Sequence, residues 1–198
     1  MSRIVIDLFV EDRAHEEFLK NMLARLAKEA QRETTIRIRS ARGGHGRVLE
    51  ELSLYQKGVQ KGLAGMTMPD LLVVAADTNC SKFNKAIKAI REKLDSLFKD
   101  RTVVACPDPH IERWYLADPE SFSRVVGVAP KVGKKKCERD YYKASLAKAV
   151  GEGGHPPTLG GIEFAREIVD AMDLYRAGKI EKSLKHFLDK AKAQLRSS

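Results

Sequence analysis

The chain has few cysteines and no long hydrophobic run. Its three cysteines, Cys80, Cys106 and Cys137, are odd in number and widely spaced, with no C-x-x-C pair. This pattern favours neither a disulfide framework nor a thiolate zinc site, and it fits a reducing cytoplasm. The apolar run in "MSRIVIDLFVEDR" is too short to cross a membrane and contains acidic residues. We therefore expect a strand at this end, with no targeting segment and no membrane partner.

The chain also has fewer acidic than basic residues. It has 27 Asp and Glu and 36 Lys and Arg, which gives a formal net charge of +9. A basic balance of this size favours an anionic partner, and nucleic acid is the commonest one. A basic protein without such a partner is the alternative. No serine or cysteine is paired with a basic residue in a recognisable catalytic order, which disfavours nucleophilic catalysis by the protein itself.

Strand patterns alternate with helix patterns through about residue 110. Apolar or period-two runs cover 3–10, 34–40, 70–76 and 101–106, and amphipathic stretches separate them. Parallel strands need long crossovers, so the alternation predicts an α/β fold with a mainly parallel sheet of about four strands flanked by helices. The run "TTIRIRS" alternates isoleucine with arginine, and it is expected near the sheet edge.

The chain changes character after Trp114, where helical patterns follow one another without strands. We expect an α/β domain over residues 1–127 and a helical C-terminal extension over 128–198 packed on it. Single helices are expected over 84–98, where Leu94 and Leu97 share an apolar face, and over 161–178.

Three carboxylates follow predicted strands: Glu11 after the first, Asp77 after the third and Glu112 soon after the fourth. The carboxyl ends of parallel strands lie at one edge of a sheet, so these residues are expected to converge there. Mg²⁺ prefers oxygen ligands and needs only one or two carboxylates when water and phosphate complete its shell. The pattern therefore predicts a divalent-metal site.

Each carboxylate also has a structural interpretation. Asp77 or Asn79 could cap the following helix, Glu11 or Asp12 could favour a helix start through the dipole, and Glu112 could be solvated. The sequence leaves these alternatives open. His110, two residues before Glu112, could orient water or a leaving group, or it could be structural.

Three segments carry a family resemblance. "IVIDLFVEDRAHEEFLKNML" resembles the first motif of Toprim domains, in which a hydrophobic strand ends on a glutamate and a helix soon begins. "DLLVVAADTN" is similar to the second motif, a strand ending on a D-x-D pair. "PDPHIERWYLADPESF" looks like part of the small stand-alone bacterial Toprim-like proteins related to OLD nucleases. The resemblance covers roughly residues 3 to 125.

The resemblance implies a Rossmann-like Toprim fold and a nuclease that uses Mg²⁺ or Mn²⁺, in some relatives linked to phage defence. It implies that Glu11 is a metal ligand or general acid/base, that Asp77 is the main metal ligand and that Asn79 is a weaker one. Glu112, after the fourth predicted strand, is our own candidate for an additional ligand. Asp12 stands where Toprim domains usually have glycine, and Asn79 where they have the second aspartate. The lost charge should weaken metal affinity.

Two basic segments are candidates for nucleic-acid binding. "RIRSARGGHGR" is an arginine-rich stretch around a glycine-rich loop, and "KVGKKK" is a short lysine run near two tyrosines. Guanidinium forks and lysines bind phosphates without choosing a sequence. The candidate residues are Arg37, Arg39, Arg42, Arg47, Lys131, Lys134, Lys135 and Lys136.

The function that the sequence favours is a divalent-metal-dependent nuclease that hydrolyses phosphodiester bonds of DNA or RNA, with Glu11, Asp77 and Glu112 as catalytic residues. A second hypothesis is a catalytically weak module that binds nucleic acid or a partner ATPase. A third is a flavodoxin-like regulatory domain in which Asp77 is a helix cap.

Overall fold

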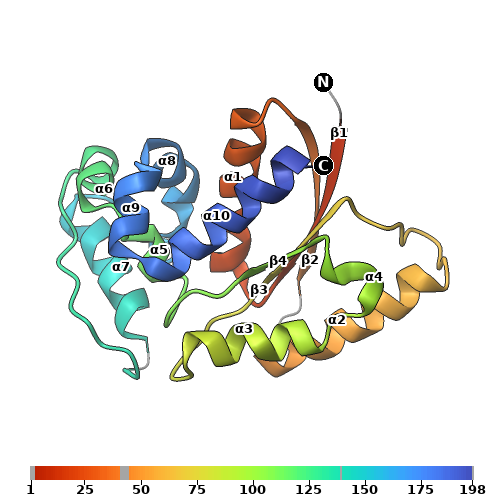
Figure 1. Ribbon diagram of the computed structural model, residues 1–198. Helices are drawn as coiled ribbons and strands as arrows, with labels where there is room; N and C mark the ends of the chain where they lie inside the picture. Colours follow the sequence, from red (N-terminus) through yellow and green to blue (C-terminus); the bar gives the residue numbers. More distant parts are fainter. Residues whose placement is uncertain (1–2, 41–44, 139, 198) are drawn as a thin grey trace.

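The fold is built around a parallel sheet. The computed structural model describes residues 3–40, 45–138 and 140–197, and Figure 1 shows the sheet crossing the molecule with helices on both sides. Within these residues the sheet has four strands in the order β2-β1-β3-β4, all parallel. Their bounds are β1 Arg3–Val10, β2 Glu33–Ser40, β3 Leu71–Ala75 and β4 Thr102–Ala105. The predicted α/β class is confirmed.

The position of each strand follows from its composition. The inner strand β3 is entirely apolar, and all five of its residues are buried. β2 has the alternating Ile and Arg pattern and lies at one edge, as expected, with half-buried residues along most of its length. In a parallel sheet, inner strands are covered on both faces, so continuous apolar runs occupy them.

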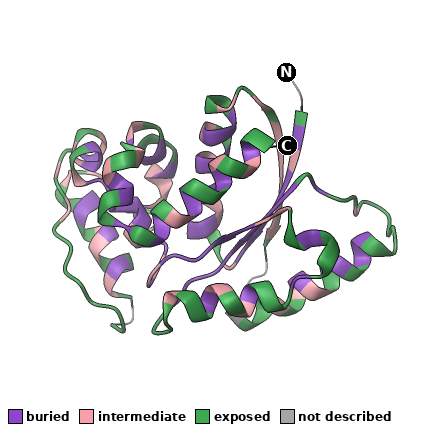
Figure 2. Ribbon diagram, viewed as in Figure 1, coloured by how far each residue is buried: buried purple, intermediate pink, exposed green. Residues whose placement is uncertain are grey.

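Helices cover the two faces and form two hydrophobic clusters (Figure 2). One face is covered by α2 (His45–Gln60), α3 (Phe83–Glu92) and α4 (Ser96–Lys99). The other is covered by α1 (Arg13–Glu29) and helices of the C-terminal half. Those later helices are α5 Glu112–Tyr115, α6 Pro119–Val126, α7 Tyr141–Glu152, α8 Ala165–Ala171, α9 Leu174–Ile180 and α10 Lys182–Ser197, with a 3-10 turn at Ile162–Phe164.

The C-terminal helices share one hydrophobic cluster with α1 and the sheet. The Trp114 ring stacks on Phe187 of α10, with ring centroids 5.5 Å apart. Arg25 of α1 donates from Nη1 to the carbonyl oxygens of Val169 and Met172, at 2.6 and 2.8 Å. The helical C-terminal part is thus confirmed as a packed element, while the division at residues 127 and 128 stays a prediction.

Two expected single helices are wrong. The segment 84–98 forms α3 and then α4, because Asp95 begins a new helix by accepting a hydrogen bond from the Leu97 N–H at 3.0 Å. Leu97 is consequently 56% exposed, where the helical pattern placed it on the apolar face. The segment 161–178 is divided in the same way, because Asp173 caps α9 through the N–H groups of Tyr175 and Arg176.

Candidate membrane spans are absent from the helices of the described ranges, none of which combines the necessary length with sufficient apolar character.

Candidate active site

The three predicted carboxylates lie around the carboxyl edge of the sheet. Glu11 directly follows β1, Asp77 lies two residues after β3, and Glu112 is the first residue of the short helix α5. Asp77 and Glu112 are both buried, each with 9% exposure. Glu11 Oε2 accepts a hydrogen bond from the backbone N–H of Asp77 at 3.0 Å. The fold therefore brings Glu11 and Asp77, which are far apart in the sequence, into direct contact.

The Asp77 carboxylate lies between two histidines. Its Oδ2 is 2.9 Å from Nδ1 of His110, and its Oδ1 is 3.1 Å from Nε2 of His15. His15 is fully buried in the first turn of α1, and its Nδ1 is 2.8 Å from Oδ1 of Asp12. These contacts form a chain from Asp12 through His15 and Asp77 to His110.

One contact in this chain is close but not well aligned. Within the described part of the protein, Nε2 of His15 and Oδ1 of Asp77 are buried and lack a hydrogen-bond partner of acceptable geometry, although they face each other. A buried acceptor left in this state costs free energy unless another group satisfies it. Asp77 Oδ1 is therefore paired with His15 by charge, without a well-aligned hydrogen bond.

The pKa values of the site residues differ from those of free side chains. Burial opposes the ionisation of Asp77, but His15 and His110 outweigh it and lower the pKa of Asp77. Burial likewise disfavours the charged form of His15, yet Asp77 and Asp12 raise its pKa well above the ordinary value. The hydrogen bond to Asp77 raises the pKa of His110. The site thus favours the ionised form of Asp77 and the protonated forms of the two imidazoles beside it.

Glu11 and Glu112 behave differently from Asp77. Burial raises the pKa of Glu11, and the nearby charge of Asp77 adds to the rise, although His15 opposes it. Burial also raises the pKa of Glu112. Carboxyl groups of raised pKa are better proton acceptors and donors near neutral pH. The edge therefore combines one carboxylate whose ionised form is favoured with two whose protonated forms are favoured.

A cavity of about 240 Å³ opens at this edge. It is lined by Asp12, Asp77, Asn79, His110, Glu112, Asp140 and Lys143. Asn79 is exposed and has a positive φ of 51°, which asparagine tolerates better than most residues. Glu11 contacts the backbone of Asp77 instead of lining this cavity. The cavity thus unites three of the four predicted metal ligands.

The ligand types suit magnesium when water contributes to the shell. In the residues that the structure describes, no group of three or more His, Cys, Asp or Glu side chains is placed to hold a metal ion. Mg²⁺ is commonly held by one or two carboxylates and several waters. Asp77, Glu112 and Asn79 line the same cavity and offer oxygen ligands. These three residues would hold the ion.

The structure supports the helix-cap interpretation for one of the acidic residues and not for the others. Asp12 does cap α1, since its side chain accepts from the backbone N–H of His15 at 3.0 Å. Neither Asp77 nor Asn79 caps α3, whose N-cap position is Lys82 and has no side-chain hydrogen bond. Glu112 is buried rather than solvated. The capping explanation therefore applies to Asp12 but not to Asp77.

The described arginines of the first basic segment contact other residues of the protein. Arg37 donates to the buried carboxylate of Asp7 and, from Nη1, to Thr67 Oγ1 at 2.5 Å. Arg39 lies over the Tyr55 ring, and Arg47 pairs with Glu51 at 2.7 Å. Arg42 lies outside the described residues. Because Arg37 forms these internal contacts, we leave it out of the proposed nucleic-acid surface.

The lysine run 131–136 is held beside the candidate site. Lys136 Nζ is 2.7 Å from Oδ1 of Asp108, which also accepts from the Thr78 hydroxyl at 3.0 Å. The Lys135 N–H donates to the Tyr142 hydroxyl oxygen at 3.0 Å. Cys137, directly after the run, forms a disulfide with Cys80. The basic segment is thus fixed to the turn that follows Asp77.

That disulfide was not predicted from the sequence. Cys80 and Cys137 are 57 residues apart, and the odd number of cysteines argued against a pair. The fold brings them together because Cys80 follows the edge of β3 and the lysine run returns to the same edge. Cys106 is a buried free thiol, and burial raises its pKa to about 12.

The sequence did not single out His15. Its place in the first helical turn after Glu11 and Asp12 is the available signal, since that turn begins at the carboxyl edge of β1. Lys143 and Asp140, which line the cavity, carried no recognisable pattern.

Comparisons with protein-family models, with curated proteins and with solved structures found no match to this chain.

Proposed function

We propose that the protein is a divalent-metal-dependent nuclease that hydrolyses phosphodiester bonds of DNA or RNA at the carboxyl edge of its sheet. The observation that carries this proposal is the cavity that Asp77 and Glu112 share beside a fixed lysine run. An acidic cavity next to basic groups suits a phosphate ester and a cation together. The resemblance of the strand-end motifs to Toprim domains supports the same function.

Asp77, Glu112 and Asn79 would hold Mg²⁺ or Mn²⁺, with Glu11 supporting Asp77 through its backbone N–H. When bound, such an ion activates water and stabilises negative charge on the phosphate. Replacing a carboxylate by the Asn79 amide lowers the charge of the site, so weak metal affinity is expected.

The protein groups have separate roles in this proposal. Glu112 has a raised pKa and lines the cavity, so it can accept a proton from the attacking water. The hydrogen bond between His110 Nδ1 and Asp77 Oδ2 favours the protonated imidazole, so the Nε2–H of His110 can donate a proton to the leaving oxygen. Lys143 lines the same cavity, and with the lysine run it can hold the phosphates that flank the scissile bond.

The proposed setting follows from the resemblance and the composition. We propose a cytoplasmic protein with a role in phage defence. In that reducing compartment, Cys80 and Cys137 would be thiols for much of the time.

An alternative is a module that binds nucleic acid or a partner ATPase without cleaving. The contacts of Asp77 favour it, because both carboxylate oxygens face a histidine ring. A metal ion would have to compete with two imidazole rings for this carboxylate.

Cleavage assays separate these functions. Plasmid, single-stranded DNA and RNA are incubated with the native protein, with Asp77→Asn and with Asp170→Asn, in Mg²⁺, Mn²⁺ or a chelator. Asp170 is an exposed aspartate on α8, so Asp170→Asn is the matched control. The nuclease proposal expects cleavage that needs metal and falls about 100-fold or more in Asp77→Asn only.

Binding without cleavage in every metal would support the module. Equal cleavage by the native protein and Asp77→Asn would exclude Asp77 from the reaction. Circular dichroism and thermal unfolding of each variant verify that the substitution leaves the fold intact.

A further inference from the structure

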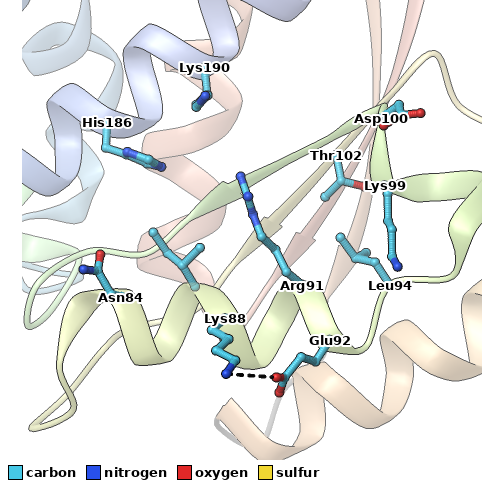
Figure 3. Close-up of a pocket in the computed structure, with 11 residues that line it drawn as sticks. Asn84, Lys88, Arg91, Glu92, Leu94, Lys99, Asp100, Thr102, His186 and Lys190 are labelled. Carbon is cyan, nitrogen blue, oxygen red and sulfur yellow. Dashed lines mark ion pairs between the residues drawn. The ribbon is translucent and has the colours of Figure 1, made fainter.

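A second and larger cavity lies away from the acidic edge, between α3 and α10 (Figure 3). Its volume is about 750 Å³, and the edge strand β4 contributes Thr102 to its wall. We call it the α3/α10 groove. Its lining residues on α3 include Asn84 and Arg91, those on α10 are His186 and Lys190, and Lys99 and Asp100 come from the end of α4.

Positive charge dominates this groove. Arg91, Lys99 and Lys190 line it, and none of them forms an ion pair with another described residue. Lys88 is paired with Glu92 at 3.7 Å, and Asp100 is the other acidic residue of the lining. The lining has four cationic side chains against the two carboxylates of Glu92 and Asp100, and this excess of positive charge attracts anions.

The pKa of His186 is affected by the positive charges of the groove. Burial lowers the pKa of His186, and the charges of Lys190 and Arg91 lower it further, while Asp189 opposes them. The imidazole is therefore neutral at neutral pH, and its ring faces the groove. The Phe83 ring lies 5.5 Å from it in an edge contact. Flat rings of this kind offer a stacking surface to nucleobases.

The shape of the groove suits an extended ligand. α3 runs for ten residues along it, which corresponds to about 15 Å of helix. At 3.4 Å per nucleotide of a stacked strand, that length spans roughly four phosphates. One end, at Asn84, is five residues after Asn79 of the acidic edge, and the other end lies at Lys99.

We propose that the α3/α10 groove binds the phosphate backbone of a single-stranded nucleic acid. Arg91, Lys99 and Lys190 contact successive phosphates, while Ile87 and the His186 ring contact the bases. This inference goes beyond the proposed nuclease function, and it holds even if the acidic edge cleaves nothing.

A binding assay in which metal-dependent cleavage is blocked tests this proposal. A fluorescent 12-nucleotide single-stranded DNA is titrated with protein in a chelator, and anisotropy gives the dissociation constant over a series of salt concentrations. The proteins are the native chain, the pair Arg91→Gln with Lys190→Gln, and the control pair Lys28→Gln with Lys57→Gln. Lys28 and Lys57 are exposed lysines on α1 and α2, so the control removes two positive charges elsewhere.

Each phosphate contact to a single strand contributes about 0.7 to the slope of log affinity against log salt. The groove pair should therefore lower the slope by about 1.4 and weaken binding roughly tenfold at moderate salt, with little change in the control. An unchanged slope in the groove pair overturns the proposal. So does a loss that occurs only when Lys134 and Lys135 are replaced, because the strand would then bind the lysine run.

Competitors identify the ligand. A poly-glutamate peptide that binds as tightly as the oligonucleotide, or ATP that displaces it completely at low concentration, would overturn the assignment to a nucleic-acid strand. A second readout is the pKa of His186 by NMR. Strand binding should raise it, because phosphates neutralise the charges of Arg91 and Lys190. No change in this pKa on saturation would contradict binding in the groove.

Discussion

Asp7 is a fully buried carboxylate within the inner strand β1. Its charge is matched by Arg37 of β2, and the Tyr55 hydroxyl of α2 donates to it as well. Burial, followed by the hydrogen bond to Asp7, raises the pKa of Tyr55, so the hydroxyl keeps its proton. A buried charge is tolerated only when its acceptors are satisfied in this way. The apolar pattern of β1 predicted the strand, but not the partners of Asp7.

The Tyr55 hydroxyl should therefore contribute to stability. Tyr55→Phe keeps the ring and removes one donor to a buried charge, so the free energy of unfolding should fall by about 2 kcal/mol. Urea denaturation measures it. Tyr175→Phe is the control, because Tyr175 is 73% exposed, and its change should stay within about 0.5 kcal/mol. Equal stability of Tyr55→Phe and the native protein would contradict this role.

The candidate site was predictable from the sequence only in part. Strand ends placed Glu11, Asp77 and Glu112 correctly at one edge, because parallel strands expose their carboxyl ends together. The contact of His15 with Asp77 depends on the position of α1 over the sheet, which periodicity does not specify. The internal pairing of Arg37 was missed for the same reason, since its partner lies on a neighbouring strand.

At the scale of elements, the sequence predicted the strands better than the ends of the helices. Apolar spacing continued across Asp95 and Asp173, and it therefore predicted longer helices than the structure has. Both residues accept hydrogen bonds from backbone N–H groups two residues later, which begins a new helix. A side-chain cap competes with helix continuation, and tertiary packing decides between them.

Glu181, the residue between α9 and α10, should make the stability of the protein depend on pH. Glu181 is buried there, and the guanidinium of Arg113 donates to it. Burial raises the pKa of Glu181 from 4.5 to about 7, although Arg113 opposes the rise. Between these values the folded state binds more protons than the unfolded state. The contribution of Glu181 to stability is therefore present below about pH 4.5 and is lost as pH rises toward 7.

Glu181→Gln should remove this dependence while keeping an acceptor for Arg113. Relative to the native protein, its folding constant should rise between pH 5 and 7, by up to roughly tenfold per pH unit. Urea denaturation at several pH values measures the difference. Glu50→Gln is a surface control, because Glu50 is exposed. Its unfolding free energy should vary with pH in the same way as that of the native protein. A parallel curve for Glu181→Gln would show that Glu181 ionises normally.

At the scale of the whole molecule, the two faces of the sheet are covered by different parts of the chain. α2, α3 and α4 cover one face, and α1 together with the C-terminal helices covers the other. The alternating pattern predicted both layers, and the later helical patterns predicted an extension packed on the α/β domain, but not that it would share one hydrophobic cluster with α1. Trp114 packs against Phe187, and its indole N–H donates to Ser183 Oγ at 2.9 Å.

A fragment that ends at residue 127 should therefore fail to fold cooperatively. It would expose the α1 side of the core and leave the indole N–H of Trp114 without its acceptor. Solubility and urea unfolding followed by circular dichroism measure this, with a chain lacking only residues 197 and 198 as control. Cooperative unfolding of the fragment would show that the predicted α/β domain folds without the C-terminal helices.

The disulfide between Cys80 and Cys137 links two distant points of one chain, and everything between them belongs to a closed ring. That ring contains His110 and Glu112, whereas Glu11 and Asp77 precede it in the sequence. A protease that cuts once between residues 81 and 136 would produce two fragments that stay joined. On a gel they should migrate as one species until a reductant is added, so a single nick would be hidden in the oxidised protein and visible in the reduced one.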